Sequence, residues 1–187
     1  MNENHRNLCA SEEWRDYLRD EILPWVLGER RLGPDALELG PGPGVTTELL
    51  VPLAERLTTV EADAEAADEL ARRFVGTSVS VIHADAARMP VPDASFSSAV
   101  ALTMLHHVPS PEAQDRVLAE VRRVLAPGGW FLGEDSTDDP GFREFHAGDV
   151  CVPVDPGTFA SRLRAAGFED AEVELGDHVV RFAARRP

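Results

Sequence analysis

The alternation of glycine and proline at positions 40–44 is the feature of this sequence that most clearly indicates ligand binding. Gly40, Gly42 and Gly44 follow a short apolar run and precede a helical stretch, so a strand leads through a tight turn into a helix. Glycine tolerates positive φ and lets the backbone approach a ligand closely. The sixth position of a dinucleotide fingerprint is Val45 instead of glycine, and no Gly-Lys-Ser/Thr follows, so neither a nicotinamide fingerprint nor a phosphate loop is complete. A merely structural turn remains the alternative.

Three carboxylates stand at positions from which they could hold a ligand. Glu38 lies inside an apolar run, where a carboxylate is costly unless something pairs with it. Glu61 lies 21 positions after Gly40, close to the offset of roughly 20 at which an acidic side chain accepts hydrogen bonds from ribose hydroxyls. Asp85 follows a later apolar run and could accept a hydrogen bond from an exocyclic amine, as on adenine. The alternatives are that Glu38 caps loop amides, Glu61 is a solvated strand end and Asp85 starts a turn.

Two adjacent histidines, His106 and His107, come directly after the apolar run 98–103. Histidine titrates near neutral pH, so either ring could accept a proton during catalysis. Alternatively, both rings could bond the backbone and hold the turn. Glu134 and Asp135 follow the next apolar run, where they could meet a cationic or hydroxylated substrate or be ordinary solvated loop charges.

The elements that must position these residues alternate between short apolar runs and amphipathic stretches. Strands are predicted at Ala36–Leu39, Leu57–Val60, Ser78–Ile82, Ser98–Thr103, Trp130–Gly133, Ala171–Leu175 and His178–Ala184, the last two as a hairpin around Gly176 and Asp177. Helices are predicted at Glu12–Leu27, Val45–Arg56, Ala64–Phe74, Pro111–Leu125 and Pro156–Ala166. This order predicts an α/β fold with a mostly parallel, doubly wound sheet and ligands at the carboxyl ends of its strands.

Composition and charge restrict the class of protein. With 187 residues, 43% of them hydrophobic, the chain is expected to form one domain with a substantial core. The formal charge of −15 argues against a nucleic-acid partner and an anionic membrane surface. No apolar run approaches the roughly 20 residues that span a bilayer, and the first residues do not resemble a secretory signal. Cys9 and Cys151 stand alone, so neither a disulfide framework nor a metal site is expected, and the expected compartment is the cytoplasm.

Together the motifs resemble the class I S-adenosylmethionine-dependent methyltransferases, and most closely their small-molecule type 11 branch. The resemblance extends from about residue 36 to the C-terminus and rests on the following segments in this order: Glu38 to Gly44, Val60-Glu61, Ala84-Asp85-Ala86, Met89 to Phe96, Leu105 to Val108 and Arg123 to Gly129. It implies a Rossmann-like sheet of seven strands with an antiparallel C-terminal strand and helices on both faces. Ser97 departs from the family, which usually has aspartate there, and Glu61 replaces the commoner aspartate.

The resemblance also implies roles for individual residues. The residues implied to contact S-adenosylmethionine, or the product S-adenosylhomocysteine, are Glu38, Gly40, Gly42, Gly44, Glu61, Ala84, Asp85, Ala86, Leu102 and Thr103. Among them Glu61 would hold the ribose hydroxyls, Asp85 would lie at adenine, and Leu102 and Thr103 would lie near the reactive methyl group. His107 matches the family's recurrent histidine and is therefore placed slightly ahead of His106 as a general base.

The expected function is in-line methyl transfer to an oxygen, nitrogen or carbon atom of a small molecule, without a metal. The motif of base-amine methylation in nucleic acids is missing after Ser98–Thr103, and so is the Pro-Cys of base-carbon methylation. A cofactor-binding module without turnover is the alternative, and a nicotinamide oxidoreductase is less favoured because of Val45. Within one domain we expect a helical extension (1–33), a cofactor-binding core (34–136) and a substrate-side loop with a helix and hairpin (137–187). The segment 138–155 is the expected substrate wall, and the protein is expected to be a monomer or a homodimer.

Overall fold

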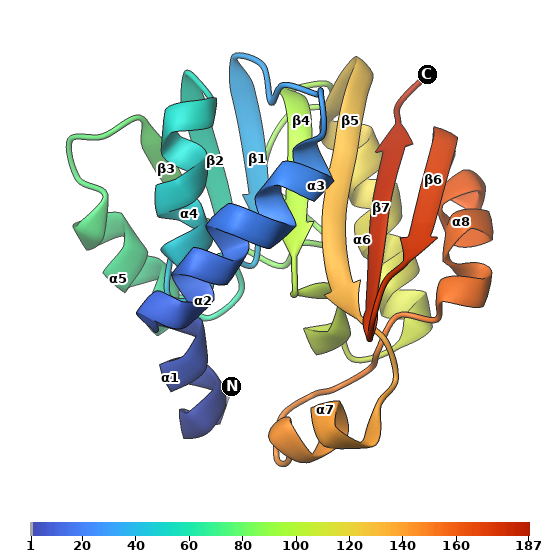
Figure 1. Cartoon of the computed structure of the whole chain (residues 1–187). Coiled ribbons are helices and arrows are strands. Elements are labelled where there is room, and N and C mark those ends of the chain that lie inside the picture. Colours follow the sequence, from blue (N-terminus) through green and yellow to red (C-terminus); the bar gives the residue numbers. More distant parts are fainter. Residues whose placement is uncertain (1) are drawn as a thin grey trace.

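The chain folds around a single seven-stranded β-sheet (Figure 1), seen in a computed structural model that describes residues 2–187. The strands lie in the order β3-β2-β1-β4-β5-β7-β6. Their bounds are β1 Asp35–Leu39, β2 Arg56–Glu61, β3 Val79–His83, β4 Phe96–Leu102, β5 Leu125–Ser136, β6 Glu169–Leu175 and β7 Val179–Arg185. The predicted hairpin is present, because β6 and β7 pair antiparallel.

The direction of the strands confirms the expected Rossmann-like topology. β3, β2, β1, β4 and β5 are parallel, whereas β7 pairs antiparallel with both β5 and β6. The chain leaves β1 toward β2 and β3 and then returns to β4 on the other side of β1. Strand order therefore reverses between β1 and β4, and the carboxyl ends of these strands are where such sheets bind ligands.

Helices cover both faces of the sheet (Figure 1). Their bounds are α1 Glu3–Cys9, α2 Glu12–Tyr17, η1 Leu18–Ile22, α3 Leu23–Leu27, α4 Val45–Leu50, η2 Val51–Leu53, α5 Ala64–Arg73, η3 Leu105–His107, α6 Pro111–Val124, α7 Pro140–Phe145 and α8 Pro156–Ala165. In Figure 1, η1, α3 and α4 lie on the near face, and α6 and α8 lie behind the sheet. The short helices α1 and α7 lie at the carboxyl ends of the parallel strands.

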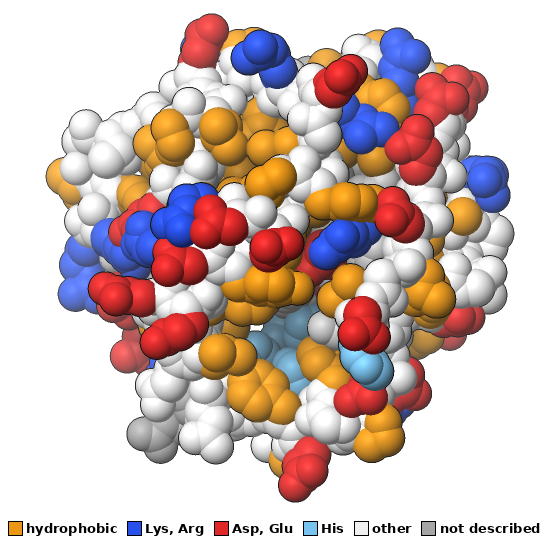
Figure 2. All heavy atoms as spheres, in the orientation of Figure 1, with side chains coloured by type: hydrophobic (Ala, Val, Ile, Leu, Met, Phe, Trp, Pro, Cys, Tyr) orange, Lys and Arg blue, Asp and Glu red, His pale blue; other side chains and the backbone are white. Residues whose placement is uncertain are grey.

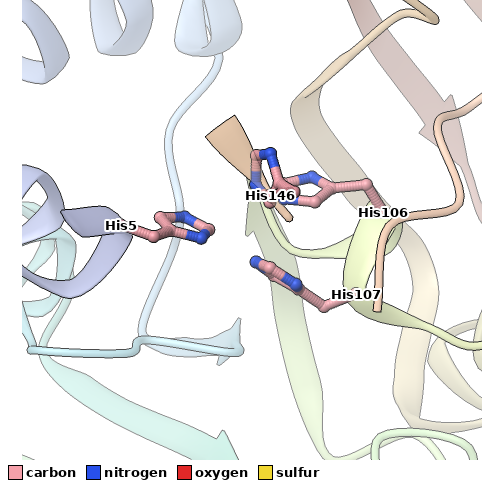
Figure 3. Close-up of side chains that lie close together, drawn as sticks. All are labelled: His5, His106, His107 and His146. Carbon is pink, nitrogen blue, oxygen red and sulfur yellow. The ribbon is translucent and has the colours of Figure 1, made fainter. Parts of the chain in front are cut away.

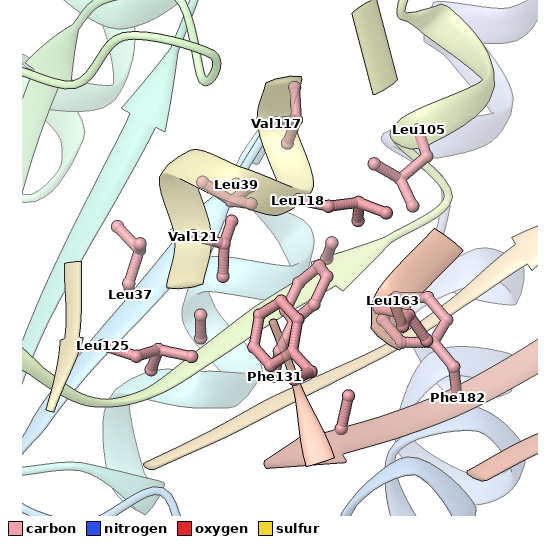
Figure 4. Close-up of a cluster of buried hydrophobic side chains, with 14 of the residues drawn as sticks. Leu37, Leu39, Leu105, Val117, Leu118, Val121, Leu125, Phe131, Leu163 and Phe182 are labelled. Atoms are coloured by element: carbon pink, nitrogen blue, oxygen red, sulfur yellow. The ribbon is translucent and has the colours of Figure 1, made fainter. Parts of the chain in front are cut away.

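Two hydrophobic layers hold the helices on the sheet. Because side chains alternate along a strand, Leu37 and Leu39 point to one face of β1, where they join Val121 of α6 and Phe131 of β5 (Figure 4). Ala36 belongs to the layer on the other face, together with residues of η1, α3 and α4. Glu38 shares this second face of β1, so the strand directs its carboxylate toward α4.

Two helices differ from the predicted ones, and proline accounts for both differences. The predicted helix Glu12–Leu27 changes to a π-helix over Leu18–Ile22, where the amide of Leu23 bonds to the carbonyl of Leu18. Pro24 follows at once; it has no N–H for an ordinary helical bond, and its ring crowds the preceding turn. The predicted helix Val45–Arg56 ends at Leu50 and tightens into η2, which contains Pro52. Arg56 begins β2 instead.

The fifth strand is longer than predicted. It starts at Leu125 instead of Trp130, and the pairing register with β4 shifts between Phe96 and Ser98. The Pro-Gly-Gly segment that was expected only to end the preceding helix therefore forms an irregular part of the strand. Gly128 adopts a φ of +80°, which glycine tolerates in such a bulge. Among the described residues, no helix is long and apolar enough to cross a membrane.

Candidate functional site

The turn after β1 requires glycine at each of the three predicted positions. Gly40, Gly42 and Gly44 have φ of +61°, +52° and +82°. A Cβ atom on Gly40 would lie 2.9 Å from the Cβ of Met104, and one on Gly44 would lie 2.6 Å from Leu70. Glycine is therefore required here both by the backbone conformation and by the side chains of Met104 and Leu70 that pack against the turn.

Glu38 is buried at the base of this turn, with 2% of its surface exposed. Its Oε2 accepts a hydrogen bond of 2.6 Å from the hydroxyl of Thr47 in α4. Its Oε1 is buried and has no hydrogen-bond partner. Burial raises the pKa of Glu38 to about 8, with a smaller contribution from the nearby carboxylate of Glu61. A buried oxygen without a donor is unfavourable and suits a ligand that brings a donor or a positive charge.

Glu61 ends β2 beside the glycine turn and is partly exposed. One carboxylate oxygen accepts a hydrogen bond of 3.2 Å from the amide of Gly42, and the other accepts one of 2.9 Å from the amide of Asp63. A carboxylate offers about four lone-pair sites, so these two bonds leave capacity for two hydroxyl groups. Asp63 itself caps α5 by accepting from the amide of Ala66.

The segment 84–86 adjoins this carboxylate. The amide of Ala84 bonds to the carbonyl of Glu61 at 3.0 Å, which holds the end of β3 against the end of β2. Ala84 and Ala86 are partly buried against the core. Asp85 accepts a hydrogen bond of 2.8 Å from the amide of Ala87, so it does form the turn that was the alternative to a ligand contact.

Leu102 ends β4 and Thr103 follows it, next to β1, where strand order reverses. Leu102 is buried, and the amide of Thr103 bonds to the carbonyl of Glu134 at 2.8 Å. Thr103 has a φ of +51°, which is unfavourable for a β-branched residue. Such strain persists only where the surroundings enforce it, and it is commonest at functional sites.

The two histidines predicted after β4 belong to a cluster of four. His106 and His107 of η3 lie beside His5 of α1 and His146, the residue that caps α7 (Figure 3). One ligand atom from each ring lies within 4.8 Å of those of the other three. Neither His5 nor His146 lies in a motif, and both are far from His106 along the chain, so no sequence signal points to them.

Burial favours the neutral form of three of these rings, His5, His107 and His146. It lowers the pKa of His5 to about 4 and that of His107 to about 3, and it also lowers the pKa of His146. Neighbouring histidines add to the effect on His5 and His107. A general base is most effective when its pKa is near the working pH. The low pKa of His107 therefore favours the alternative in which this ring holds the structure of the loop.

Glu134 and Asp135 lie in the last part of β5, where they are buried and paired, contrary to the alternative of solvated loop charges. Glu134 and Asp135 are each 1% exposed. Glu134 accepts a hydrogen bond of 2.6 Å from Arg181 of β7. Asp135 accepts bonds of 2.7 Å from the amide of Leu105 and from Nδ1 of His106. Asp135 thereby fixes η3 and the histidine pair on the sheet.

The segment 138–155, expected as a substrate wall, contains α7 and packs against the histidines. The ring of Phe142 lies edge-on to His106 at 5.0 Å between centroids. The amide of Val152 bonds to the carbonyl of His106 at 2.7 Å. A hollow of about 440 Å³ runs along the segment and is lined by Asp138, Arg143, Cys151, Val152, Pro153, Val154, Asp155 and Pro156. Figure 2 shows histidine side chains at the bottom of a recess bordered by hydrophobic ones.

Comparison with known proteins agrees with this geometry. Residues 37–133, about half of the chain, match the family model Methyltransf_11, described as a methyltransferase domain. A probable S-adenosylmethionine-dependent methyltransferase of Mycolicibacterium smegmatis is 29% identical over 96% of this chain and 74% of its own length.

Two further relatives align with shorter parts. A probable ribosomal RNA small subunit methyltransferase A of Natronomonas pharaonis is 32% identical over 66% of this chain and 45% of its own length. The 27-O-demethylrifamycin SV methyltransferase of Amycolatopsis mediterranei is 35% identical over 49% of this chain and 36% of its own length. The chain thus matches less than half the length of these two relatives.

Solved structures share the whole fold. A SAM-dependent methyltransferase from Aquifex aeolicus superimposes with a TM-score of 0.76 at 18% identity, covering 100% of both chains. The N-methyltransferase NodS from Bradyrhizobium japonicum WM9, in complex with S-adenosyl-L-homocysteine, gives a TM-score of 0.73 at 20% identity, covering 100% of this chain and 93% of that one. With its glycine turn and Glu61 inside the matched residues 37–133, the chain belongs to the class I S-adenosylmethionine-dependent methyltransferases of the type 11 branch.

Proposed function

We propose that this methyltransferase acts on an oxygen, nitrogen or carbon atom of a small molecule, with the cofactor held at the carboxyl ends of β1 and β2. The single observation that supports the cofactor position best is the pair of carboxylates on either side of the glycine turn. Glu38 presents a buried Oε1 that lacks a donor, and Glu61 keeps lone pairs free while two backbone amides orient it.

Each residue then has a role that follows from its chemistry. Glu38 would accept from the cationic amino end of the cofactor, and the backbone at Gly40, Gly42 and Gly44 would border its methionine and ribose portions. Glu61 would accept from both ribose hydroxyls. The residues proposed to lie at the adenine are Ala84, Asp85 and Ala86, and those proposed to lie near the methyl group are Leu102 and Thr103.

When bound, the cofactor would supply a methyl group on a positively charged sulfur. The acceptor's lone pair would form a bond to this carbon in line with the carbon–sulfur bond, which would break and leave a neutral thioether. The contribution of the chain is mainly to position the two reactants, which can supply roughly 7–11 kcal/mol in favourable systems. His106 and His107 border the acceptor side in this proposal. The burial of His106 and the low pKa of His107 support a positioning role more than proton acceptance.

The acceptor class is inferred from charge and space. The formal charge of −15 disfavours a polyanionic RNA, since few phosphates would be neutralised. The hollow of about 440 Å³ along segment 138–155 has the volume of a small-molecule site, roughly 300–1,000 Å³, although it is lined only by that segment and Pro156 and by none of the residues assigned to the cofactor. The relatives include enzymes named for rifamycin and for ribosomal RNA, so the test must include both kinds of acceptor.

Calorimetry with S-adenosylhomocysteine tests the cofactor site. We expect micromolar binding to the unaltered chain and at least a tenfold weaker affinity for Glu61→Ala, because two hydroxyl hydrogen bonds to a charged group would be lost. Glu69→Ala is the matched control, because this exposed glutamate lies on α5 away from the turn, and its affinity should not change. Equal affinity in Glu61→Ala and in the unaltered chain would refute the ribose assignment.

Transfer of an isotopically labelled methyl group tests the acceptor class. Label is expected in members of a panel of hydroxylated, amine and carbon-acid metabolites, and not in ribosomal or transfer RNA. Labelling confined to RNA would contradict the proposal. Tight cofactor binding without transfer to any small molecule in the panel would instead favour a module that binds the cofactor without turnover.

A further inference from the structure

The four clustered histidines come from three separate parts of the chain, which meet at the carboxyl edge of the sheet. His5 lies in the N-terminal helix α1, His106 and His107 lie in η3, and His146 caps α7 (Figure 3). We propose that these four rings bind a divalent transition metal ion of the zinc class. The proposal departs from the expectation of no metal and does not depend on which acceptor the enzyme uses.

The spacing of the rings suits tetrahedral coordination. In a site with zinc–nitrogen distances of about 2.0 Å, ligand nitrogens are about 3.3 Å apart and imidazole centroids about 5 Å apart. Here one nitrogen from each ring lies within 4.8 Å of the others. The centroid separations run from 4.1 Å for His106 and His107 to 6.3 Å for His5 and His106. Small side-chain movements are therefore enough to bring four nitrogens onto one ion.

Every ring is oriented by an acceptor at its Nδ1 atom. The four contacts are His5 to the carboxylate of Asp149 at 3.3 Å, His106 to the carboxylate of Asp135 at 2.7 Å, His107 to the carbonyl of Val150 at 3.1 Å and His146 to the carbonyl of Phe142 at 2.8 Å. A carboxylate or carbonyl can only accept, so the proton of each neutral ring is on Nδ1. The lone pair is then on Nε2, and metal-binding histidines are typically oriented by such a partner on their other nitrogen.

Three of these lone pairs accept no hydrogen bond from the described part of the chain. The Nε2 atoms of His106, His107 and His146 are buried and have no hydrogen-bond partner. His106 is 1% exposed and His146 is 3% exposed. A buried polar atom without a partner costs about 1–3 kcal/mol. Packing of aromatic rings explains why the histidines stack, but it does not explain three buried Nε2 atoms without a hydrogen-bond partner. One cation satisfies all of them.

The chemistry of the donors selects the ion. Neutral imidazoles suit zinc, copper, nickel and ferrous iron, whereas magnesium and calcium prefer oxygen donors. The carboxylates of Asp135 and Asp149 stand directly behind His106 and His5 and would offset part of the charge of a dication. Bound metal would also join α1 to η3 and α7, and would thereby fasten the N-terminal helix over the acceptor side of the site.

Calorimetry with zinc chloride on the full chain, freed of metal by a chelator, tests the site. We expect one zinc ion per chain with a dissociation constant in the micromolar range or below, and no binding of magnesium. His5→Ala and His146→Ala should each weaken binding at least tenfold. Replacement by cobalt should give the intense visible absorption of a four-coordinate ion, a readout independent of activity.

Three variants are the controls. His83→Ala and His178→Ala remove histidines outside the cluster, and Cys9→Ser removes a thiol near the N-terminus; all three should keep zinc affinity unchanged. Circular dichroism establishes that each variant is folded, and His146→Asn provides a milder change if His146→Ala is not. Absence of stoichiometric zinc binding, or equal affinity in folded cluster variants and in the unaltered chain, would overturn the proposal.

Discussion

At the scale of single residues, the cofactor side of the site depends on Glu38, a carboxylate that an ordinary buried strand would not contain. Its neighbours in β1 are apolar, and the strand places it on the face covered by α4, where Thr47 provides one donor. The second oxygen has no donor. In the ligand-free protein the carboxyl group therefore stays protonated to a pH well above its ordinary pKa. Stability is thus given up at the position that we assign to the cofactor.

The raised pKa of Glu38, about 8, makes the stability of the ligand-free protein depend on pH. The folded state holds this proton above the ordinary pKa of 4.5, so the contribution is complete below pH 4.5 and is lost as pH rises toward 8. Its loss can reach about 1.4 kcal/mol per pH unit in that window. Glu38→Gln should remove this slope. Denaturant unfolding of both proteins at several pH values measures it, and parallel stability profiles would contradict the assigned protonation.

At the scale of elements, the end of β5 depends on a glycine that lets the neighbouring strands pack closely against it. β5 passes between β4 and β7, and Gly133 lies at the centre of this arrangement. A Cβ atom there would overlap the carbonyl oxygen of Ala101 and the ring of Phe182. Because Gly133 has no side chain, Phe182 can pack directly on the sheet, next to Glu134 and Asp135 of the same strand as Gly133.

Gly133→Ala should destabilise the fold by about 3 kcal/mol or more, because neither the carbonyl nor the ring can move without disturbing a neighbouring strand. Gly157→Ala is the matched control, since its Cβ would meet only a side-chain oxygen of Asp155 at 3.3 Å, in the first turn of α8. The melting temperatures of the two variants, measured by thermal unfolding, distinguish the two substitutions. A melting temperature of Gly133→Ala equal to that of Gly157→Ala would show that the overlap is relieved cheaply.

At the scale of the whole molecule, charge is the dominant property. Acidic and basic side chains are interspersed on the face shown in Figure 2, but 33 acidic residues oppose 18 basic ones over the full chain. Self-repulsion of this kind weakens the folded state and is screened by salt. The same field opposes the approach of a polyanion to the acceptor side of the sheet.

Raising sodium chloride from about 0.02 M to about 0.2 M shortens the Debye length from about 20 Å to about 7 Å and should raise the melting temperature by a few degrees. Differential scanning calorimetry at fixed pH, without metal or cofactor, measures the shift. An equal shift with sodium sulfate at matched ionic strength would identify screening as the cause. A melting temperature that falls with salt would show that attractive ion pairs outweigh the repulsion.

The boundaries that differ from the predicted ones have two causes, which are proline within a helix and pairing within the sheet. Apolar periodicity and glycine punctuation predicted each strand, because both depend on neighbours a few positions away. Pro24 and Pro52 altered the helices Glu12–Leu27 and Val45–Arg56, and the pairing of β5 with β4 extended a strand through Pro127, Gly128 and Gly129. In that last case the pairing of two strands set the boundary. The pattern of one segment does not show which other strand it pairs with.

The sequence by itself determined the family, the sheet, and the glycine turn with its carboxylates Glu38 and Glu61, because each of these is written in short motifs and in the order of elements. Only the tertiary structure decided that Glu134 and Asp135 are buried and paired, and that His5 and His146 join His106 and His107. His5 and His106 are 101 positions apart. They are brought together because α1 packs beside η3 and α7 at one edge of the sheet, and no local pattern records which distant side chains such packing brings together.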